Sequence, residues 1–226
     1  MKKPSLLLLL TLLISSLAMA QTGSSLKPSF GVRGGLSSAS MKGEAVNNLQ
    51  DLLEYADGNI TTHSRTGYFA GAYVNLPLTE GLSVEPGVYY TQKGYEMRGK
   101  FNIKGMDFLG INGKAQLTSQ YIDMPLLLKG SIGGFEIFGG PQLSYLAKAN
   151  LRTTAGALGF NMLDKTMDAT EQFNRWDAGL TGGIGYQFPY GINVRASYDY
   201  GMSKADANKR LESYNRSFKV GVGLSF

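Results

Sequence analysis

Apolar and polar residues alternate with a period of two along most of the chain. The pattern is clearest in the last segment, SFKVGVGLSF, where every second residue from Phe218 to Phe226 is apolar and the residues between are Lys, Gly or Ser. This is the period of a β-strand with one apolar face. The alternation predicts eight strands, at about 29–39, 65–77, 81–97, 116–130, 134–149, 173–188, 191–202 and 213–226.

The links between the predicted strands alternate between short and long. Those after the second, fourth and sixth strands are PLTEG (77–81), GSIGG (130–134) and FPYG (188–191), whereas the others span roughly ten to twenty-five residues. When neighbouring strands are antiparallel, this order places tight turns at one end of the sheet and every large loop at the other. The links therefore predict an up-and-down barrel.

The apolar face of this barrel is predicted to point outward, into lipid. A soluble lipocalin-like carrier has the same alternation with its apolar face inside, but an eight-stranded interior is too narrow for about forty apolar side chains. Charged residues would also be costly in an apolar core, whereas they can pair when they are gathered in a lumen. We therefore expect an all-β fold, an eight-stranded antiparallel transmembrane β-barrel, with the carrier as its soluble alternative.

Large aromatic residues of the apolar face lie near the strand ends, in two groups. The groups are about nine to eleven residues apart, which matches strands that cross a bilayer between its two interfaces. These residues are predicted to contact the lipid at each interface. The short-turn group is Phe30, Phe135, Tyr186, Phe188 and Phe226, and the long-loop group is Tyr68, Tyr90, Tyr145, Trp176, Tyr198 and Tyr200.

The charged residues of the opposite face are nearly balanced in sign. One interpretation is a polar channel for a small ion or solute. The interpretation that we favour is a network of ion pairs that plugs a narrow barrel, because eight strands leave no aqueous pore. General porin activity is then not expected. The predicted lumen residues are Arg33, Glu85, Asp123, Lys129, Glu136, Asp177, Arg195, Asp199 and Lys219.

The amino-terminal residues have the features of a secretion signal. Lys2 and Lys3 precede a short apolar run, and small residues at Ala18 and Ala20 form a cleavage motif. We expect residues 1–20 to be removed and residues 21–226 to form one barrel domain. The chain contains no cysteine, which argues against lipid anchoring and disulfides. Its net charge of +5 is scattered, so no nucleic-acid partner is expected.

Five segments carry a family resemblance: YIDMPLLLKG (121–130), FGGPQLSYLAKA (138–149), RWDAGLTGGIGYQF (175–188), SYDYGMSKAD (197–206) and NRSFKVGVGLSF (215–226). They resemble the PorT-like outer-membrane β-barrel domain family. The resemblance implies a Gram-negative outer membrane, with short periplasmic turns, long extracellular loops and surrounding outer-membrane lipid. A terminal aromatic such as Phe226 also resembles the signal by which the barrel-insertion machinery recognises its clients.

Three further segments raise other functions. His63 beside Ser64 suggests the alternative of an outer-membrane lipid hydrolase, in which the two side chains would have to be within hydrogen-bond distance. Adjacent strand residues point to opposite faces, so these two cannot easily pair. Residues 45–58 have the apolar spacing of a helix that docks an extracellular partner or caps the barrel. Residues 153–172, with Phe160, Met162 and Leu163, are interpreted in the same way. We find no metal-ligand cluster and no nucleotide motif, and expect neither a catalytic site nor a cofactor.

Overall fold

A computed structural model describes residues 26–42, 59–101, 111–157, 160–204 and 214–226 of the chain. The predicted signal peptide and the expected helix at 45–58 lie outside these residues. The described residues contain two short 3-10 helices, η1 (Thr170–Gln172) and η2 (Pro189–Gly191). Their strands are β1 (Ser29–Lys42), β2 (Asn59–Thr79), β3 (Leu82–Phe101), β4 (Ile111–Ile132), β5 (Phe135–Ala157), β6 (Phe160–Asp168), β7 (Trp176–Gln187), β8 (Ile192–Gly201) and β9 (Tyr214–Ser225).

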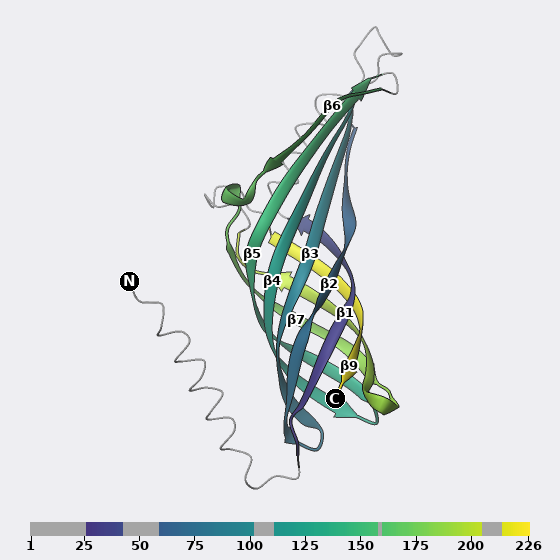
Figure 1. Ribbon diagram of the computed structural model, residues 1–226, viewed down its shortest axis with the longest axis vertical. Helices are drawn as coiled ribbons and strands as arrows, with labels where there is room; N and C mark the ends of the chain where they lie inside the picture. Colours follow the sequence, from purple (N-terminus) through teal and green to yellow (C-terminus); the bar gives the residue numbers. More distant parts are fainter. Residues whose placement is uncertain (1–25, 43–58, 102–110, 158–159, 205–213) are drawn as a thin grey trace, which may run out of the picture.

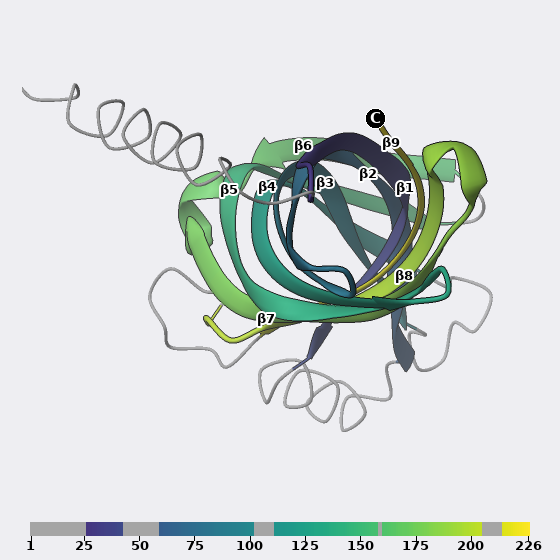
Figure 2. The same cartoon turned by 90° about the horizontal axis from the view of Figure 1, so that it is seen from below.

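Eight of these strands close into a ring. The order is β4-β3-β2-β1-β9-β8-β7-β5, every pairing is antiparallel, and β4 pairs with β5 to complete the circle. Figure 2 shows the ring of strands from below. The seam between β1 and β9 extends to the last residue, because the backbones of Phe30 and Phe226 exchange hydrogen bonds of 3.3 and 2.8 Å. The predicted eight-stranded up-and-down barrel is confirmed.

The three tight turns lie where the sequence predicts them. They connect β2 to β3, β4 to β5, and β7 to β8, the last through η2. The turn between β4 and β5 consists of Gly133 and Gly134, with φ angles of 56° and 89°. Glycine adopts this left-handed conformation without a steric penalty, which explains the GG pair.

The long-loop end departs from the prediction. Strands β2 to β5 continue beyond the ends of β1, β7, β8 and β9 and, with β6, project as a sheet from one side of the barrel (Figure 1). β3 and β4 remain paired as far as Phe101 and Ile111, and β5 and β6 as far as Ala157 and Phe160. The expectation of a helix within 153–172, to dock a partner or cap the barrel, is therefore wrong, because most of this segment is a β-hairpin.

The strand that pairs with β5 on the side away from β4 is interrupted and consists of two parts, β6 and β7. β6 pairs with the outer part of β5 and β7 with its inner part, and η1 lies between them. At the break, the Ala149 amide donates to the Thr170 hydroxyl at 3.0 Å, and the Leu146 amide donates to the Arg175 carbonyl at 2.8 Å. These bonds replace the missing rungs of the ladder, so the wall remains hydrogen-bonded where the chain bulges outward.

The faces of the wall have the predicted orientation. On β9, Val220, Val222 and Leu224 are 40–56% exposed on the outside, whereas Arg195 and Lys219 are buried inside. This orientation excludes the lipocalin-like alternative, which requires the reverse.

Within the described residues, no helix is long and apolar enough to cross a bilayer.

Candidate functional site in the barrel lumen

The structure buries every charged residue that the alternation assigns to the lumen. Their exposed fractions are at most 8%, and they come from seven of the eight wall strands. Side chains on one face of a strand recur at every second residue, so closure of the sheet brings all of them to the axis. The lumen therefore contains a concentrated set of charges whose partners decide its chemistry.

Glu85 is the centre of a lower cluster, near the tight turns. Arg195 donates to both of its carboxylate oxygens, at 2.7 and 2.8 Å. The Nη1 atom of Arg33 lies 3.1 Å from the same carboxylate and Lys129 lies 3.6 Å from it. Glu136 contacts Arg195 at 2.8 Å and Lys129 at 3.2 Å. Three cations and two carboxylates thus form one continuous ionic cluster.

Polar and aromatic side chains fix the orientation of Arg33 in the lower cluster. Its Nε donates to the amide oxygen of Asn193 at 3.2 Å, and its Nη1 donates to the Tyr89 hydroxyl at 2.9 Å. The guanidinium lies 4.1 Å from the ring centre of Tyr73, and Asn193 donates to the Tyr73 hydroxyl at 2.9 Å. Such supporting bonds stabilise buried charges that would otherwise be costly.

Asp123 is the centre of an upper cluster. It accepts hydrogen bonds from Lys219 and Ser144, each at 2.7 Å, and Lys93 lies 3.6 Å away. Lys219 also pairs with Asp199 at 2.7 Å. Every member is buried, so these pairs are only weakly screened by salt.

Asp177 was predicted as a member of the ion-pair network, but it forms no ion pair among the described residues. It accepts instead from the side-chain amide of Asn215 at 2.8 Å and from the backbone of Ser203 at 3.3 Å. Asn215 in turn accepts from the Tyr95 hydroxyl at 2.7 Å. Asp177 therefore belongs to a hydrogen-bonded layer above the ionic clusters, where neutral donors satisfy its oxygens.

With Asp177, the two clusters contain five cations and five carboxylates and are electrically neutral. The prediction omitted Lys93, although it lies on the same strand face as Glu85, an even number of residues away. The predicted strand at 81–97 already includes Lys93, so the two-residue alternation from Glu85 assigns it to the lumen face. The cations are Arg33, Lys93, Lys129, Arg195 and Lys219, and the carboxylates are those of Glu85, Asp123, Glu136, Asp177 and Asp199.

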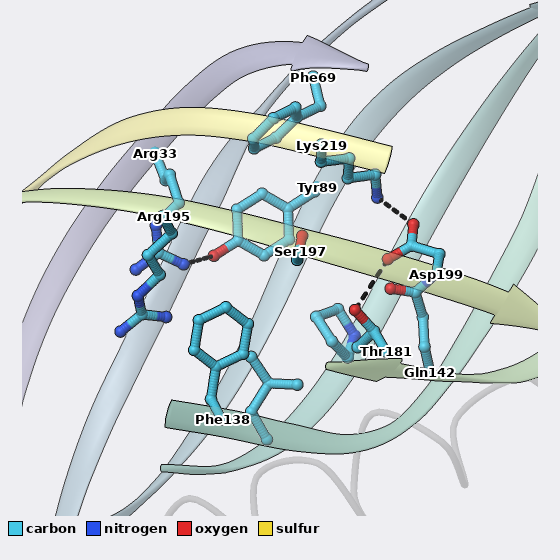
Figure 3. Close-up of a pocket in the computed structure, with 12 residues that line it drawn as sticks. Arg33, Phe69, Tyr89, Phe138, Gln142, Thr181, Arg195, Ser197, Asp199 and Lys219 are labelled. Atoms are coloured by element: carbon cyan, nitrogen blue, oxygen red, sulfur yellow. Dashed lines mark hydrogen bonds and ion pairs between the residues drawn. The ribbon is translucent and has the colours of Figure 1, made fainter. Parts of the chain in front are cut away.

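An aromatic layer separates the two clusters. Phe69, Tyr89 and Phe138 are buried there, around a cavity of about 50 Å³ that Arg195 borders on one side and Lys219 on the other (Figure 3). A volume of this size has room for only a few water molecules. A second cavity beside Asp177 measures about 10 Å³. Side chains thus fill most of the lumen at this level.

An apolar layer lies farther toward the long-loop end. Tyr121, Leu146 and Ala149 are buried together, and Leu117 and Phe173 pack against them. Phe173 comes from the link between η1 and β7, so the interruption in the wall supplies part of this layer. The lumen is therefore layered, with apolar groups above and between its ionic clusters.

The hydrolase hypothesis gains no support from the backbone. His63 lies in β2, opposite Glu96 of β3, and Ser64 is the next residue on the same strand. Adjacent residues of a strand point to opposite faces. In the described ranges, no group of three or more His, Asp or Glu residues could hold a metal ion.

The predicted interface aromatics lie on the outer wall. Most are exposed, and Tyr90, Tyr145 and Tyr186 are half-buried against neighbouring rings. Tyr145 and Trp176 lie 4.9 Å apart between ring centres at one end, and Phe135 and Tyr186 also lie 4.9 Å apart at the other. The ten residues between these levels span about 33 Å along a strand, or about 25 Å across a bilayer when the strand is tilted.

The family model for the outer membrane protein beta-barrel domain matches residues 19–207. The chain belongs to this family. The family predicted from the sequence is thus confirmed at the level of the domain, and the protein resides in the outer membrane. No curated protein sequence matches.

Solved structures of outer-membrane barrels resemble this outer membrane protein in fold. Ail of Yersinia pestis is 12% identical with a TM-score of 0.44, covering 89% of this chain and 100% of its own. Neisserial surface protein A is 14% identical with a TM-score of 0.41, at 89% and 100% coverage. OprG of Pseudomonas aeruginosa is 16% identical with a TM-score of 0.41, at 88% and 95% coverage.

Proposed function

We propose that this outer-membrane barrel has a structural and recognition role and that its lumen does not act as a general pore. The observation that carries the proposal is the pairing of Glu85 with Arg195 across the lumen, at 2.7 and 2.8 Å. The surrounding charges are paired as well, and a solute would have to separate them. Breaking a buried pair leaves an uncompensated charge, which is strongly unfavourable.

The aromatic layer supports the same proposal. Phe69 and Phe138 lie between the ionic clusters, where an apolar constriction disfavours a continuous column of water. The projecting sheet of β2 to β6 is then the part of the chain that offers a surface to an extracellular partner. In this proposal the barrel body anchors that sheet, and it has no catalytic role.

Planar-bilayer recording tests the closed lumen. The purified barrel, shown to be folded by its heat-dependent gel mobility, is added to a bilayer beside a known general porin as the positive control. We expect little or no stable current from this barrel under conditions in which the porin gives regular steps. Large, reproducible openings that appear only with the folded sample would overturn the proposal.

A further inference from the structure

Four basic side chains lie on the outside of the wall, just beyond the aromatic group at the long-loop end. Arg65 and Lys148 each lie three residues from an aromatic of that group on the same strand, and Arg175 directly precedes Trp176. Arg216 lies directly opposite Tyr200 on the neighbouring strand. The neighbours of Arg216 along β9 are buried in the lumen, so Arg216 itself points outward. We call this set the outer basic rim. It consists of Arg65, Lys148, Arg175 and Arg216.

The rim cations lack the ion pairs that the lumen cations form, although Lys148 and Arg175 interact with the Asp168 carboxyl at longer range. In the part of the chain that the structure describes, none of the four forms an ion pair, whereas each of the five lumen cations lies within 3.6 Å of a carboxylate. Neutral groups hold the rim instead. Arg65 donates to the Thr118 hydroxyl at 3.3 Å, and Arg175 donates to the Leu146 carbonyl at 3.5 Å.

Arg216 shows how the wall fixes one of these charges at the interface. Its guanidinium lies 3.5 Å from the ring centre of Tyr200 and 5.8 Å from that of Tyr214. Its Nη1 donates to the carbonyls of Gly201 and Asn215, at 2.5 and 3.0 Å. The cation–π contact and the carbonyl bonds hold the charge beside the wall. Nε and Nη2 form no hydrogen bond with the described residues, so they can donate to an external anion.

Lys148 and Arg175 border a hollow of about 540 Å³ on the outer wall, beside η1. Two of its lining residues are close in sequence to the ring pair of Tyr145 and Trp176, because Lys148 follows Tyr145 by three residues and Arg175 directly precedes Trp176. Asp168 also borders it, and hydrogen bonds from Thr170 together with the nearby cations hold the pKa of that carboxyl below its usual value. Glu171 also borders the hollow, so two carboxylates oppose the two cations there, and both would repel an anionic ligand.

We propose that the outer basic rim binds phosphate groups of the outer-leaflet lipid. The aromatic group marks the boundary between hydrocarbon and headgroups, and lipid phosphates lie just beyond such a boundary. Basic side chains at this level attract anionic headgroups, and Arg binds phosphate through its planar array of donors. The hollow beside η1 gives one headgroup a place against the wall, and Arg65 and Arg216 extend the contact around the barrel.

Native mass spectrometry of the folded barrel tests the proposal. The probes are a phosphorylated glycolipid, the same glycolipid after removal of its phosphates, and inorganic phosphate. We expect the phosphorylated lipid to bind preferentially, and each rim cation replaced by Gln to weaken this binding about fivefold. Glu171→Gln is expected to strengthen it, which a general loss of folding could not do.

Lys165→Gln is the matched control, because Lys165 is exposed on β6, away from the aromatic group. Heat-dependent mobility verifies that each variant is folded. Three results would overturn the proposal: equal binding of the phosphorylated and dephosphorylated lipids, an unchanged preference when all four cations are replaced, and inorganic phosphate that binds as tightly as the lipid. The third would assign the rim to a soluble anion instead of a membrane component.

Discussion

The guanidinium of Arg195 and the carboxylate of Glu85 form a two-pronged ion pair across the lumen, with N–O distances of 2.7 and 2.8 Å. The two residues are 110 positions apart in the chain, on β8 and β3. Parallel N–H donors that meet both carboxylate oxygens make this the strongest geometry available to such a pair. Arg33 and Lys129 contact the same carboxylate, so the stability of the lower cluster depends on Glu85.

Glu85→Gln should therefore destabilise the barrel strongly. The substitution removes the negative charge that three buried cations share, and we expect a loss of about 3–5 kcal/mol in the free energy of unfolding. Urea unfolding in detergent micelles measures this loss. Glu80→Gln is the control, because Glu80 is exposed in a tight turn and its replacement should change stability by less than about 0.5 kcal/mol. Equal effects of the two substitutions would refute the role of Glu85.

Gly221→Ala should destabilise the barrel because the lumen face has no room for a methyl group there. An added Cβ would lie 2.6 Å from the Phe69 ring and 2.8 Å from the Gly34 carbonyl. Overpacking of this kind costs about 1–3 kcal/mol. At Gly130 the nearest atom to an added Cβ is 3.7 Å away, so Gly130→Ala should be tolerated. The two variants compared in one unfolding series test the packing, and a tolerated Gly221→Ala would contradict it.

Trp176 reports the depth of the aromatic group without any substitution. It is the single tryptophan of the chain and its side chain is 49% exposed on the outer wall. Because the aromatic groups lie at the membrane interface, lipids brominated near the headgroup should quench its fluorescence more than lipids brominated near the chain ends. Stronger quenching by bromine at the chain ends would place Trp176 in the bilayer centre and contradict the assigned interface.

Phe226→Ala should slow assembly by the barrel-insertion machinery several-fold, if the terminal aromatic is read as an insertion signal. Phe135→Ala is a closely matched control, because Phe135 is 70% exposed at the same end of the barrel and Phe226 is 71% exposed. Reconstituted insertion measures the rate, and unassisted refolding into detergent separates recognition from stability. If both variants insert at the same rate, Phe226 has no special role in recognition.

The strand pattern made most of the wall predictable from the sequence. A residue such as Val222 alternates with Gly221 and Gly223, and such alternation assigns each side chain to a face before any partner strand is known. The charged face could be assigned to the lumen because an isolated Arg195 could not remain in lipid. The tight turns were predictable because Gly133 and Gly134 adopt conformations that other residues avoid.

The partners within the lumen could not be predicted from alternation. Whether Lys219 meets Asp123 or Asp177 depends on the stagger between strands, which the period of two does not contain. The projecting sheet was also missed, because strands outside the bilayer need no apolar face and their alternation is weak. Phe160 and Met162 are two residues apart, which also suits a strand, but the apolar residues of 153–172 were interpreted as one face of a helix.

The long sequence separation of the lumen pairs has a consequence for biogenesis. Lys219 meets Asp123 from 96 positions away, and Arg33 meets Glu85 from 52 positions away. An open sheet halfway through assembly would present these charges singly to the hydrocarbon. Pairing of the lumen charges and closure of the sheet are therefore expected to happen together. Until β1 and β9 meet, the unpaired charges of the nascent barrel need contact with water or with a chaperone.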